Sequence, residues 1–382
     1  MIFRILEDQL AEKSRLSKAA DQRFMQLALA LGRRGQGRTW PNPAVGAVVV
    51  KDDVIVGRGW TQPGGRPHAE PEALGRAGEA ARGATLYVTL EPCSHLGKSP
   101  PCADAVIAAG IARVVSAIED PNPEVAGKGH ARLRAAGIAV DIGLCGAEAA
   151  HDHAGHFRRV RDKRPHVILK LAVSADDKIG AAGGQRAAIT GDAAKARVHL
   201  LRAQCDAILV GISTVQADDP LLTCRLPGMA GRSPVRIVLD RALRLSGASR
   251  LVHSARQTPL WVVTSELAEA SAATKLGAAG AQVIRVAPTS GSGLDLAAVL
   301  HALADRGITR LMVEGGAKVA SSFVSADLVD EFWLLRGPQA IGADGIAALD
   351  ALPLTTITQS PGFSVRASQS FGSDTLIIYG RG

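Results

Sequence analysis

Short apolar runs alternate with helix-like segments along almost the whole chain, and this alternation constrains the fold more than any other feature. Runs such as VGAVVV (45–50), ATLYVTL (84–90) and DAILVG (206–211) are typical of buried strands, while AAKARVHLLRAQ (193–204) has helical periodicity. The pattern predicts an α/β architecture with chemically active groups on loops at the strand ends. The 47% hydrophobic content is sufficient for a full core, and a length of 382 residues exceeds that of most single domains. Two domains are therefore expected.

The order of the expected elements indicates where the domains meet. In the first half, strands are expected at 45–50, 54–60, 84–90, 112–118 and 138–144, with helices at 22–34, 70–78, 102–110 and 130–137. In the second half, strands are expected at 166–174, 206–211, 234–240, 259–265, 281–287, 308–316 and 330–336. Residues 151–165 interrupt the apolar pattern with three histidines and a run of charges. We therefore predict an N-terminal extension over 1–20, a first domain over 21–150, a linker over 151–165 and a second domain over 166–382.

The net charge of +8 predicts attraction of anions, which include nucleic acid, acidic membranes and small phosphorylated ligands. The basic clusters are short and scattered, and no aromatic stacking series accompanies them, which disfavours a nucleic-acid partner. No apolar run is long enough to span a membrane, and acidic residues interrupt the first 20 positions, which disfavours a secretory signal. With five cysteines and no export signal, we expect reduced thiols, a cytoplasmic location and no membrane partner.

Three residues with metal-ligand chemistry stand at the ends of consecutive expected elements. His68 precedes a helix, Cys93 follows a strand, and Cys102 begins the next helix. One imidazole and two thiolates suit a tetrahedral zinc site whose fourth position is open, as catalytic sites require. Glu70 is two residues beyond His68, where it can move protons between an attacking water and a leaving amine. Together these residues indicate zinc-dependent deamination of an amino-substituted heterocycle.

Other interpretations of these residues stay open at this point. Intracellular cysteines are often small core residues, and a structural zinc module would leave Glu70 without a role. Nucleic-acid base deaminases share the same signature. The histidines at 151, 153 and 156 lie in a polar segment without a nearby cysteine, so we interpret them as surface groups rather than ligands.

The segment Thr89–Cys102, TLEPCSHLGKSPPC, places eight residues between the cysteines instead of the common two. It closely resembles the bifunctional riboflavin biosynthesis deaminase/reductases, a branch of the cytidine deaminase-like superfamily whose motif reads T-L-E-P-C-S-H-x-G-[KR]-x-P-P-C. Pro41-Asn42-Pro43 also matches, and the resemblance implies that Asn42 approaches the pyrimidine of the substrate. His95 and Lys98, inside the spacer, are candidates for contact with its phosphate or ribose.

The resemblance implies a cytidine deaminase-like α/β/α sandwich followed by a dihydrofolate reductase-like α/β domain. It implies zinc-dependent hydrolytic deamination of 2,5-diamino-6-ribosylamino-4(3H)-pyrimidinone 5′-phosphate, then reduction of the ribosyl group to ribityl with NADPH. The expected partner is this small phosphorylated pyrimidine, and the expected assembly is a homo-oligomer.

Motifs in the second half resemble the reductase in the same order, from Lys170-Leu-Ala-Val-Ser174 to Val313-Glu314-Gly315-Gly316. Glycines at a strand-to-helix turn let a helix N-terminus approach a pyrophosphate. By position, the resemblance places NADPH contacts at Ala172, Thr214, Asp218, Gly315, Gly316, Ala317, Lys318, Val319, Ala320, Ser321 and Ser322. It places substrate contacts at Asn42, Lys170, Arg202, Leu222, Arg225 and Glu314, and the two arginines suit a phosphate.

Two departures from the family pattern define an alternative. The family has Ser-Leu-Asp-Gly where this chain has Ser174-Ala-Asp-Asp177, and a Trp where this chain has Ala188. Asp tolerates a left-handed backbone better than most residues, whereas loss of the Trp removes a stacking surface for cofactor or pyrimidine. We favour an active reductase; the alternative is an active deaminase joined to a degenerate second domain.

Overall fold

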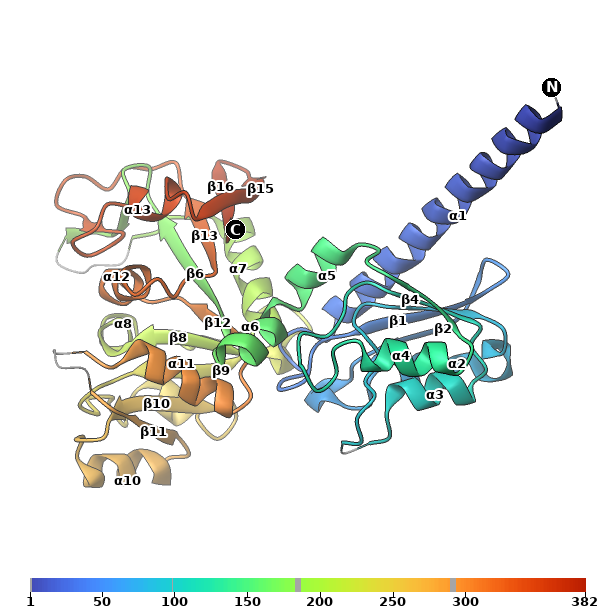
Figure 1. Cartoon of the computed structure of the whole chain (residues 1–382). Helices are drawn as coiled ribbons and strands as arrows, with labels where there is room; N and C mark the ends of the chain where they lie inside the picture. Colours follow the sequence, from blue (N-terminus) through green and yellow to red (C-terminus); the bar gives the residue numbers. More distant parts are fainter. Residues whose placement is uncertain (1, 98, 183–186, 289–292) are drawn as a thin grey trace. The chain divides into compact units, whose positions relative to one another are not determined.

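The computed structural model describes residues 2–97, 99–182, 187–288 and 293–382, with side chains from residue 18 onward. The chain divides into two compact units, Met1–Asp162 and Lys163–Gly382, and each is described by itself (Figure 1). In the described residues, no helix combines the length and the hydrophobicity needed to cross a membrane. The expected α/β class is observed in both units.

A five-stranded sheet forms the centre of the first unit, in the order β2-β1-β3-β4-β5. Strands β3, β4 and β5 are parallel, whereas β1 is antiparallel to both β2 and β3. The strand bounds are β1 Gly46–Lys51, β2 Val54–Trp60, β3 Thr85–Val88, β4 Arg113–Ser116 and β5 Ala139–Ile142. Four of these strands lie within the segments where the sequence predicts them, and β1 extends one residue beyond its predicted segment.

Helices cover both faces of this sheet, because its buried strands carry apolar side chains on both sides. Val48 and Val50 pack with Phe24 and Met25 of α1 on one face, while Val49 packs against α2 and α3 on the other. The sandwich of helix, sheet and helix predicted from the family resemblance is thus confirmed (Figure 1). The helix bounds are α1 Ile2–Arg33, α2 Ala69–Ala77, α3 Cys102–Ala108, α4 Lys128–Ala135, α5 Gly146–Asp152 and α6 Ala154–Asp162. Short 3-10 helices cover Pro63–Gly65 and Gly78–Ala81.

The segment 151–165, which the sequence predicts to be a linker, is largely helical. It contains the end of α5 and all of α6, and both helices belong to the first unit, which ends at Asp162. Phe157 of α6 is buried in the first unit's core. The predicted extension over 1–20 likewise belongs to the single helix α1, which runs on into the domain.

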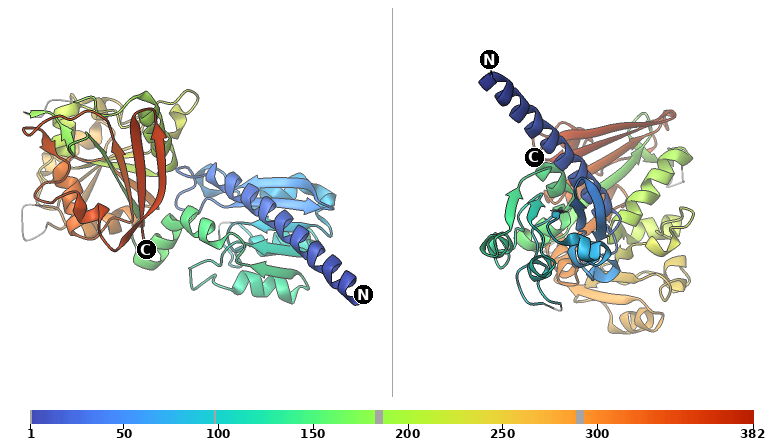
Figure 2. Two further views of the ribbon diagram at one scale, coloured as in Figure 1. Left: turned by 90° about the horizontal axis from the view of Figure 1, so that it is seen from above. Right: turned by 90° about the vertical axis from the view of Figure 1, so that its right-hand side faces the viewer.

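The second unit is built on a nine-stranded sheet with the order β11-β10-β9-β8-β12-β6-β13-β16-β15. The strands from β11 to β13 are mutually parallel, and the hairpin of β16 and β15 adds an antiparallel edge (Figure 2). Their bounds are β6 His166–Val173, β8 Ala207–Gly211, β9 Val235–Leu239, β10 Leu260–Ser265, β11 Gln282–Val286, β12 Arg310–Val313, β13 Glu331–Arg336, β15 Phe363–Phe371 and β16 Asp374–Arg381. A separate small pair joins β7 Lys178–Gly180 to β14 Ile346–Ala347.

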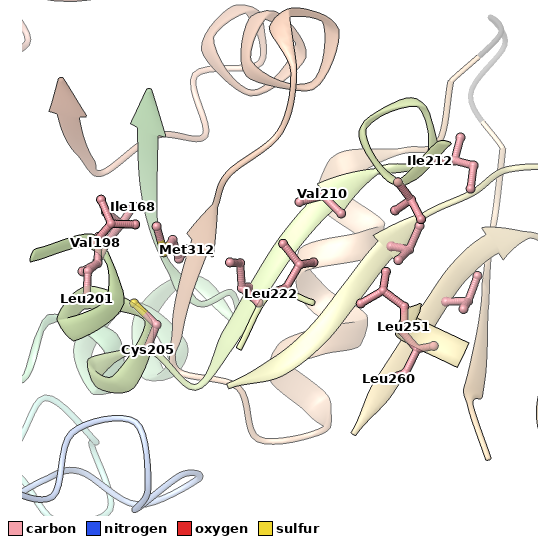
Figure 3. Packing of buried hydrophobic residues seen from close by; sticks show 14 of the residues in the cluster. Ile168, Val198, Leu201, Cys205, Val210, Ile212, Leu222, Leu251, Leu260 and Met312 are labelled. Carbon is pink, nitrogen blue, oxygen red and sulfur yellow. The ribbon is translucent and has the colours of Figure 1, made fainter. Parts of the chain in front are cut away.

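Helices of the second unit pack apolar side chains onto this sheet. Val198 and Leu201 of α7 belong to the same buried cluster as Ile168 of β6 and Met312 of β12 (Figure 3). Cys205 lies in this cluster, and burial raises the pKa of its thiol, so it acts as a small apolar residue. None of the five cysteines forms a disulfide in this structure. The helix bounds are α7 Asp192–Gln204, α8 Ile212–Asp218, α9 Arg250–His253, α10 Ala270–Ala278, α11 Leu296–Asp305, α12 Ala317–Ser325 and α13 Thr355–Thr358, with a 3-10 helix at Ala230–Arg232.

Candidate metal centre and cofactor cavity

Three elements of the first unit bring the predicted metal ligands together. His68 is the N-cap of α2, Cys102 is the first residue of α3, and Cys93 lies in the loop that follows β3. Helix α2 lies directly on β2 because Gly59 has no side chain: a Cβ there would stand 2.2 Å from the Ala69 carbonyl oxygen. This close approach sets the position of the first turn of α2, which carries both His68 and Glu70.

The ligand atoms of His68, Cys93 and Cys102 all lie within 4.8 Å of one another. Nδ1 of His68 is 3.3 Å from the Cys102 sulfur and 3.8 Å from the Cys93 sulfur. The amide of Asn42, which also donates to the Gly65 carbonyl oxygen, lies 3.3 Å from the other ring nitrogen of His68. One imidazole and two sulfurs converging on one point form a donor set that fits Zn²⁺ and leaves one tetrahedral position for water.

The electrostatics of the two thiols favour a bound cation. A hydrogen bond from the Cys102 thiol, supported by His68 and the backbone N–H of Cys102, lowers the pKa of Cys93 to about 4 despite burial. The same contact with Cys93 raises the pKa of Cys102. The lowered pKa of Cys93 favours the thiolate, which is the form that ligates zinc.

Glu70 lies beside this centre with only 3% of its surface exposed. Burial raises the pKa of its carboxyl to about 7, and the negative charge of Cys93 acts in the same direction. A carboxyl with a pKa near neutrality can both accept and return a proton, which is the property of a general acid–base group. The geometry thus places the predicted proton carrier next to the predicted metal ligands.

The remaining predicted residues of the first unit have varied surroundings. His95 lies in the spacer between the cysteines close to Gly97 and Arg66, and Lys98 lies outside the described residues. The prediction that the histidines at 151–156 are surface groups is wrong for His153, which is 2% exposed. Its Nε2 lies 3.1 Å from the Thr89 hydroxyl, and Nε2 of His156 lies 3.2 Å from the Asp120 carboxylate. These contacts explain the two histidines as packing groups, His153 at the end of α5 and His156 in α6.

In the second unit, a cavity of about 700 Å³ opens beside the C-terminal ends of β8 and β12. Ligands bind at this edge in open α/β sheets. Most of the predicted cofactor and substrate positions line it, namely Lys170, Ala172, Thr214, Asp218, Glu314, Gly315, Gly316, Ala317, Lys318 and Val319. Residues that the sequence analysis does not single out also line it, among them Ile189, Thr190, Lys195, Ser213 and Asp350.

The turn from β12 into α12 forms one wall of the cavity. Gly316 is the N-cap of α12, and its N–H donates to the hydroxyl of Thr214 at 3.2 Å. The free N–H groups of such a helix start attract phosphate. The next predicted positions do not line the cavity: Ala320 is buried, the Ser321 hydroxyl accepts the Asp350 N–H, and the Ser322 hydroxyl donates to the helix backbone.

Glu314 is the centre of an ion cluster at the cavity wall. Its carboxylate lies 3.2 Å from the ammonium of Lys170 and 2.8 Å from the guanidinium of Arg202. Burial alone would raise the pKa of Glu314, but Lys170 and Arg202 together hold it at about 2. The Glu314 carboxylate therefore stays ionised at any physiological pH.

The two other predicted substrate residues lie on the loop after α8. Leu222 is buried with φ of 54°, and Arg225 is exposed with its backbone N–H donating to Nδ1 of His199. Burial and then the positive charge of Arg202 lower the pKa of Arg225. Arg202 and Arg225 thus form one electropositive region, although neither they nor Leu222 line the cavity itself.

The two departures from the family pattern are both accommodated. Asp177 has φ of 62°, the left-handed region that the family's glycine would adopt freely, and its carboxylate pairs with Arg336 at 2.6 Å. Ala188 lines the cavity, so a Trp at this position would face its interior. Neither change closes the cavity or leaves a buried charge unpaired.

Comparison with known proteins identifies the family. Residues 165–377 match the RibD C-terminal domain, and residues 18–118 match the cytidine and deoxycytidylate deaminase zinc-binding region. The riboflavin biosynthesis protein RibD of Aquifex aeolicus is 40% identical over 361 residues, which cover 94% of this chain and 98% of the relative. The Escherichia coli RibD is 39% identical over 370 residues, again covering 94% and 98%. The chain belongs to the RibD family.

Solved RibD structures agree with this assignment over nearly the full length. Acinetobacter baumannii RibD superposes with a TM-score of 0.84 at 35% identity, covering 96% of this chain and 99% of that one. The Thermotoga maritima diaminohydroxyphosphoribosylaminopyrimidine deaminase/5-amino-6-(5-phosphoribosylamino)uracil reductase superposes with a TM-score of 0.82 at 36% identity, covering 96% and 100%. The RibD assignment confirms a zinc-binding deaminase domain followed by a reductase domain, as predicted from the sequence.

Proposed function

We propose that this chain catalyses two consecutive reactions of riboflavin biosynthesis. The first unit deaminates 2,5-diamino-6-ribosylamino-4(3H)-pyrimidinone 5′-phosphate, and the second unit reduces the ribosyl group with NADPH, giving 5-amino-6-(5-phosphoribitylamino)uracil. The observation that carries the proposal is the convergence of His68, Cys93 and Cys102 beside buried Glu70. Membership of the RibD family supports the order of the two reactions.

In the deaminase, His68, Cys93 and Cys102 would hold Zn²⁺, which acts as a Lewis acid and lowers the pKa of water to about 7. Glu70 takes one proton from the attacking water and passes it to the ring nitrogen, then takes the second proton from the resulting hydroxyl group and passes it to the departing amine. Ammonia leaves, and a carbonyl oxygen replaces the amino group on the ring. Asn42, in contact with His68, is placed to hold the pyrimidine.

In the reductase, NADPH supplies the hydride. The Thr214 hydroxyl, which contacts the start of α12, and the free N–H groups at that helix end would bind cofactor phosphate. Lys170 and Glu314 face the cavity as a fixed ion pair that can orient hydroxyl groups of the sugar. Arg202 and Arg225 provide charge for the substrate phosphate.

A two-stage assay tests this assignment. With the diamino substrate and no NADPH, the enzyme should release ammonia and stop; addition of NADPH should then start nicotinamide oxidation, followed as a loss of absorbance. Removal of zinc with a chelator should abolish ammonia release and leave reduction of the deaminated intermediate unchanged, because the metal ligands all lie in the first unit. Ammonia release that persists after complete zinc removal would disprove the metal-dependent mechanism.

The cavity also predicts the effect of restoring the missing aromatic ring. Ala188→Trp should lower the KM for NADPH about 2- to 10-fold, because aromatic contacts of this kind contribute roughly 0.5–1.5 kcal/mol. Steady-state kinetics with the deaminated intermediate measures the change. Ala270→Trp, at an exposed alanine that does not line the cavity, is the matched control. An unchanged KM in Ala188→Trp would show that this position does not contact the cofactor.

The alternative of a degenerate reductase has no support from the two departures, since Asp177 fits its backbone and Ala188 leaves the cavity open. Full turnover of NADPH in the assay above separates the two possibilities. A cytoplasmic homo-oligomer stays a prediction.

A further inference from the structure

The two cysteines of the metal centre are joined by a long spacer that has little regular structure of its own. Residues 94–101 separate Cys93 from Cys102, and within the described part of this spacer no helix or strand is formed. In the common signature only two residues separate the cysteines, so local backbone geometry holds the sulfurs in place. A spacer of eight residues cannot do this alone, and another part of the fold must hold its two ends.

Helix α4 contacts both ends through one side chain. The guanidinium of Arg132 donates to the carbonyl oxygen of Ser94 at 3.3 Å and pairs with the carboxylate of Asp104 at 2.6 Å. Ser94 directly follows Cys93, and Asp104 lies on the first turn of α3, two residues after Cys102. One planar group on α4 therefore bridges the two segments that carry the thiols.

The start of α4 is in turn fixed to the Cys93 segment through Glu91. The Glu91 side chain is completely buried, and its carboxylate accepts four backbone N–H groups, at 3.2, 3.0, 2.8 and 3.2 Å. These donors belong to Asp120, Gly127, Gly129 and His130, which lie before α4 and in its first turn. Glu91 is two residues before Cys93. Its hydrogen bonds therefore connect the start of α4 to the loop that carries the Cys93 thiol.

The backbones themselves meet at this point. A Cβ on Gly129 would stand 2.0 Å from the carbonyl oxygen of Pro92, the residue before Cys93. Helix α4 therefore rests against the Cys93 segment without an intervening side chain. A shift of α4 toward this segment would therefore displace Pro92 and, with it, the sulfur of Cys93.

We infer that α4 is a brace for the zinc centre, and that Glu91 and Arg132 are positioning residues that hold the Cys93 and Cys102 sulfurs at the separation zinc requires. The inference rests on the proposed function in one respect, that zinc binds at His68, Cys93 and Cys102. Groups that orient metal ligands without touching the metal commonly change metal affinity about 10- to 100-fold when they are removed. The brace acts on metal retention, not on the substrate.

Arg132→Met in the full chain tests the brace. The Arg132 side chain is 46% exposed and the Asp104 side chain is 38% exposed. Loss of this exposed ion pair should therefore cost little stability, and the variant should fold. Zinc release into a chelating metallochromic dye should be at least about 10-fold faster than in the wild type. Excess Zn²⁺ should restore ammonia release, whereas the KM for the diamino substrate and the reductase rate should stay unchanged.

Arg134→Met is the matched control, because Arg134 lies on the same helix and donates to the Val140 carbonyl oxygen, away from both cysteines. Equal zinc release from Arg132→Met and Arg134→Met would overturn the inference.

Glu91→Gln is a second test, because it turns an N–H₂ group toward backbone N–H donors. This variant should release zinc faster than Arg132→Met; zinc release at the wild-type rate would also count against the brace. If the wild type retains zinc yet releases no ammonia, the proposed function fails while the comparison of the two arginine variants still decides the brace.

Discussion

Glu70→Gln should keep its zinc and lower kcat for deamination by about 10²- to 10⁴-fold, the usual contribution of a positioned acid–base group. The amide has the shape of the carboxyl, so the first turn of α2 and the adjacent His68 should keep their positions. It can neither accept the proton of the attacking water nor return it to the leaving amine. Ammonia release at saturating substrate, with zinc content measured on the same sample, gives the result.

Glu72→Gln provides the control for this change, because Glu72 lies on the same helix but pairs with Arg76 at 3.0 Å on the surface. The pH dependence adds a second test. Glu70 must be ionised to accept a proton, so the wild-type rate should fall as the pH drops through the pKa of this carboxyl, and bound Zn²⁺ should place that pKa below the metal-free value of about 7. Deamination by Glu70→Gln at the wild-type rate would remove Glu70 from the mechanism.

Glu314→Gln should destabilise the second unit by about 3–5 kcal/mol and strongly reduce the reductase rate, because breaking a buried ion cluster leaves like charges without compensation. Lys170 and Arg202 both face this carboxylate, and their side chains are each only 11% exposed. Calorimetry of the full chain measures the loss of stability, with the melting of the first unit as an internal reference. Glu269→Gln, at an exposed glutamate of the second unit, is the control.

The sign of the pH dependence follows from the depressed pKa of Glu314. Lys170 and Arg202 hold the pKa at about 2, below the ordinary value of 4.5, so the ionised carboxylate stabilises the folded state. This contribution is fully present above about pH 4.5 and is lost as the pH falls toward 2. The stability difference between wild type and Glu314→Gln should therefore be constant at neutral pH and shrink below pH 4.5. A difference that stays the same down to pH 3 would show that the carboxylate charge is not its source.

The strands and the metal ligands could be predicted because their signals are local. Buried strands such as β3 and β8 are short runs made mostly of apolar side chains. His68, Cys93 and Cys102 each lie at the end of an element, and within one α/β unit such ends meet at the same edge of the sheet. For the same reason the glycines after β12 indicate the turn that forms the cavity wall.

What the sequence could not show depends on contacts between distant residues. Helix α6 buries Gly155 and Phe157, and charged residues and His156 make up most of the rest, so its packing against the first unit leaves little apolar signal in the segment predicted to be a linker. Strand β15 is an edge strand with mostly exposed side chains, and its polar sequence conceals it. The cofactor range predicted from the sequence continues through Ala320–Ser322, but these residues do not line the cavity because a helix presents only one face to it.

The left-handed turn at Asp177 has a consequence for recognising related enzymes. The family has glycine at this position, whereas here the Asp177 carboxylate pairs with the guanidinium of Arg336. The turn therefore accepts a charged side chain when an oppositely charged partner lies beside it. A search for reductase domains of this family that requires glycine at this position would therefore miss chains that, like this one, carry aspartate opposite an arginine.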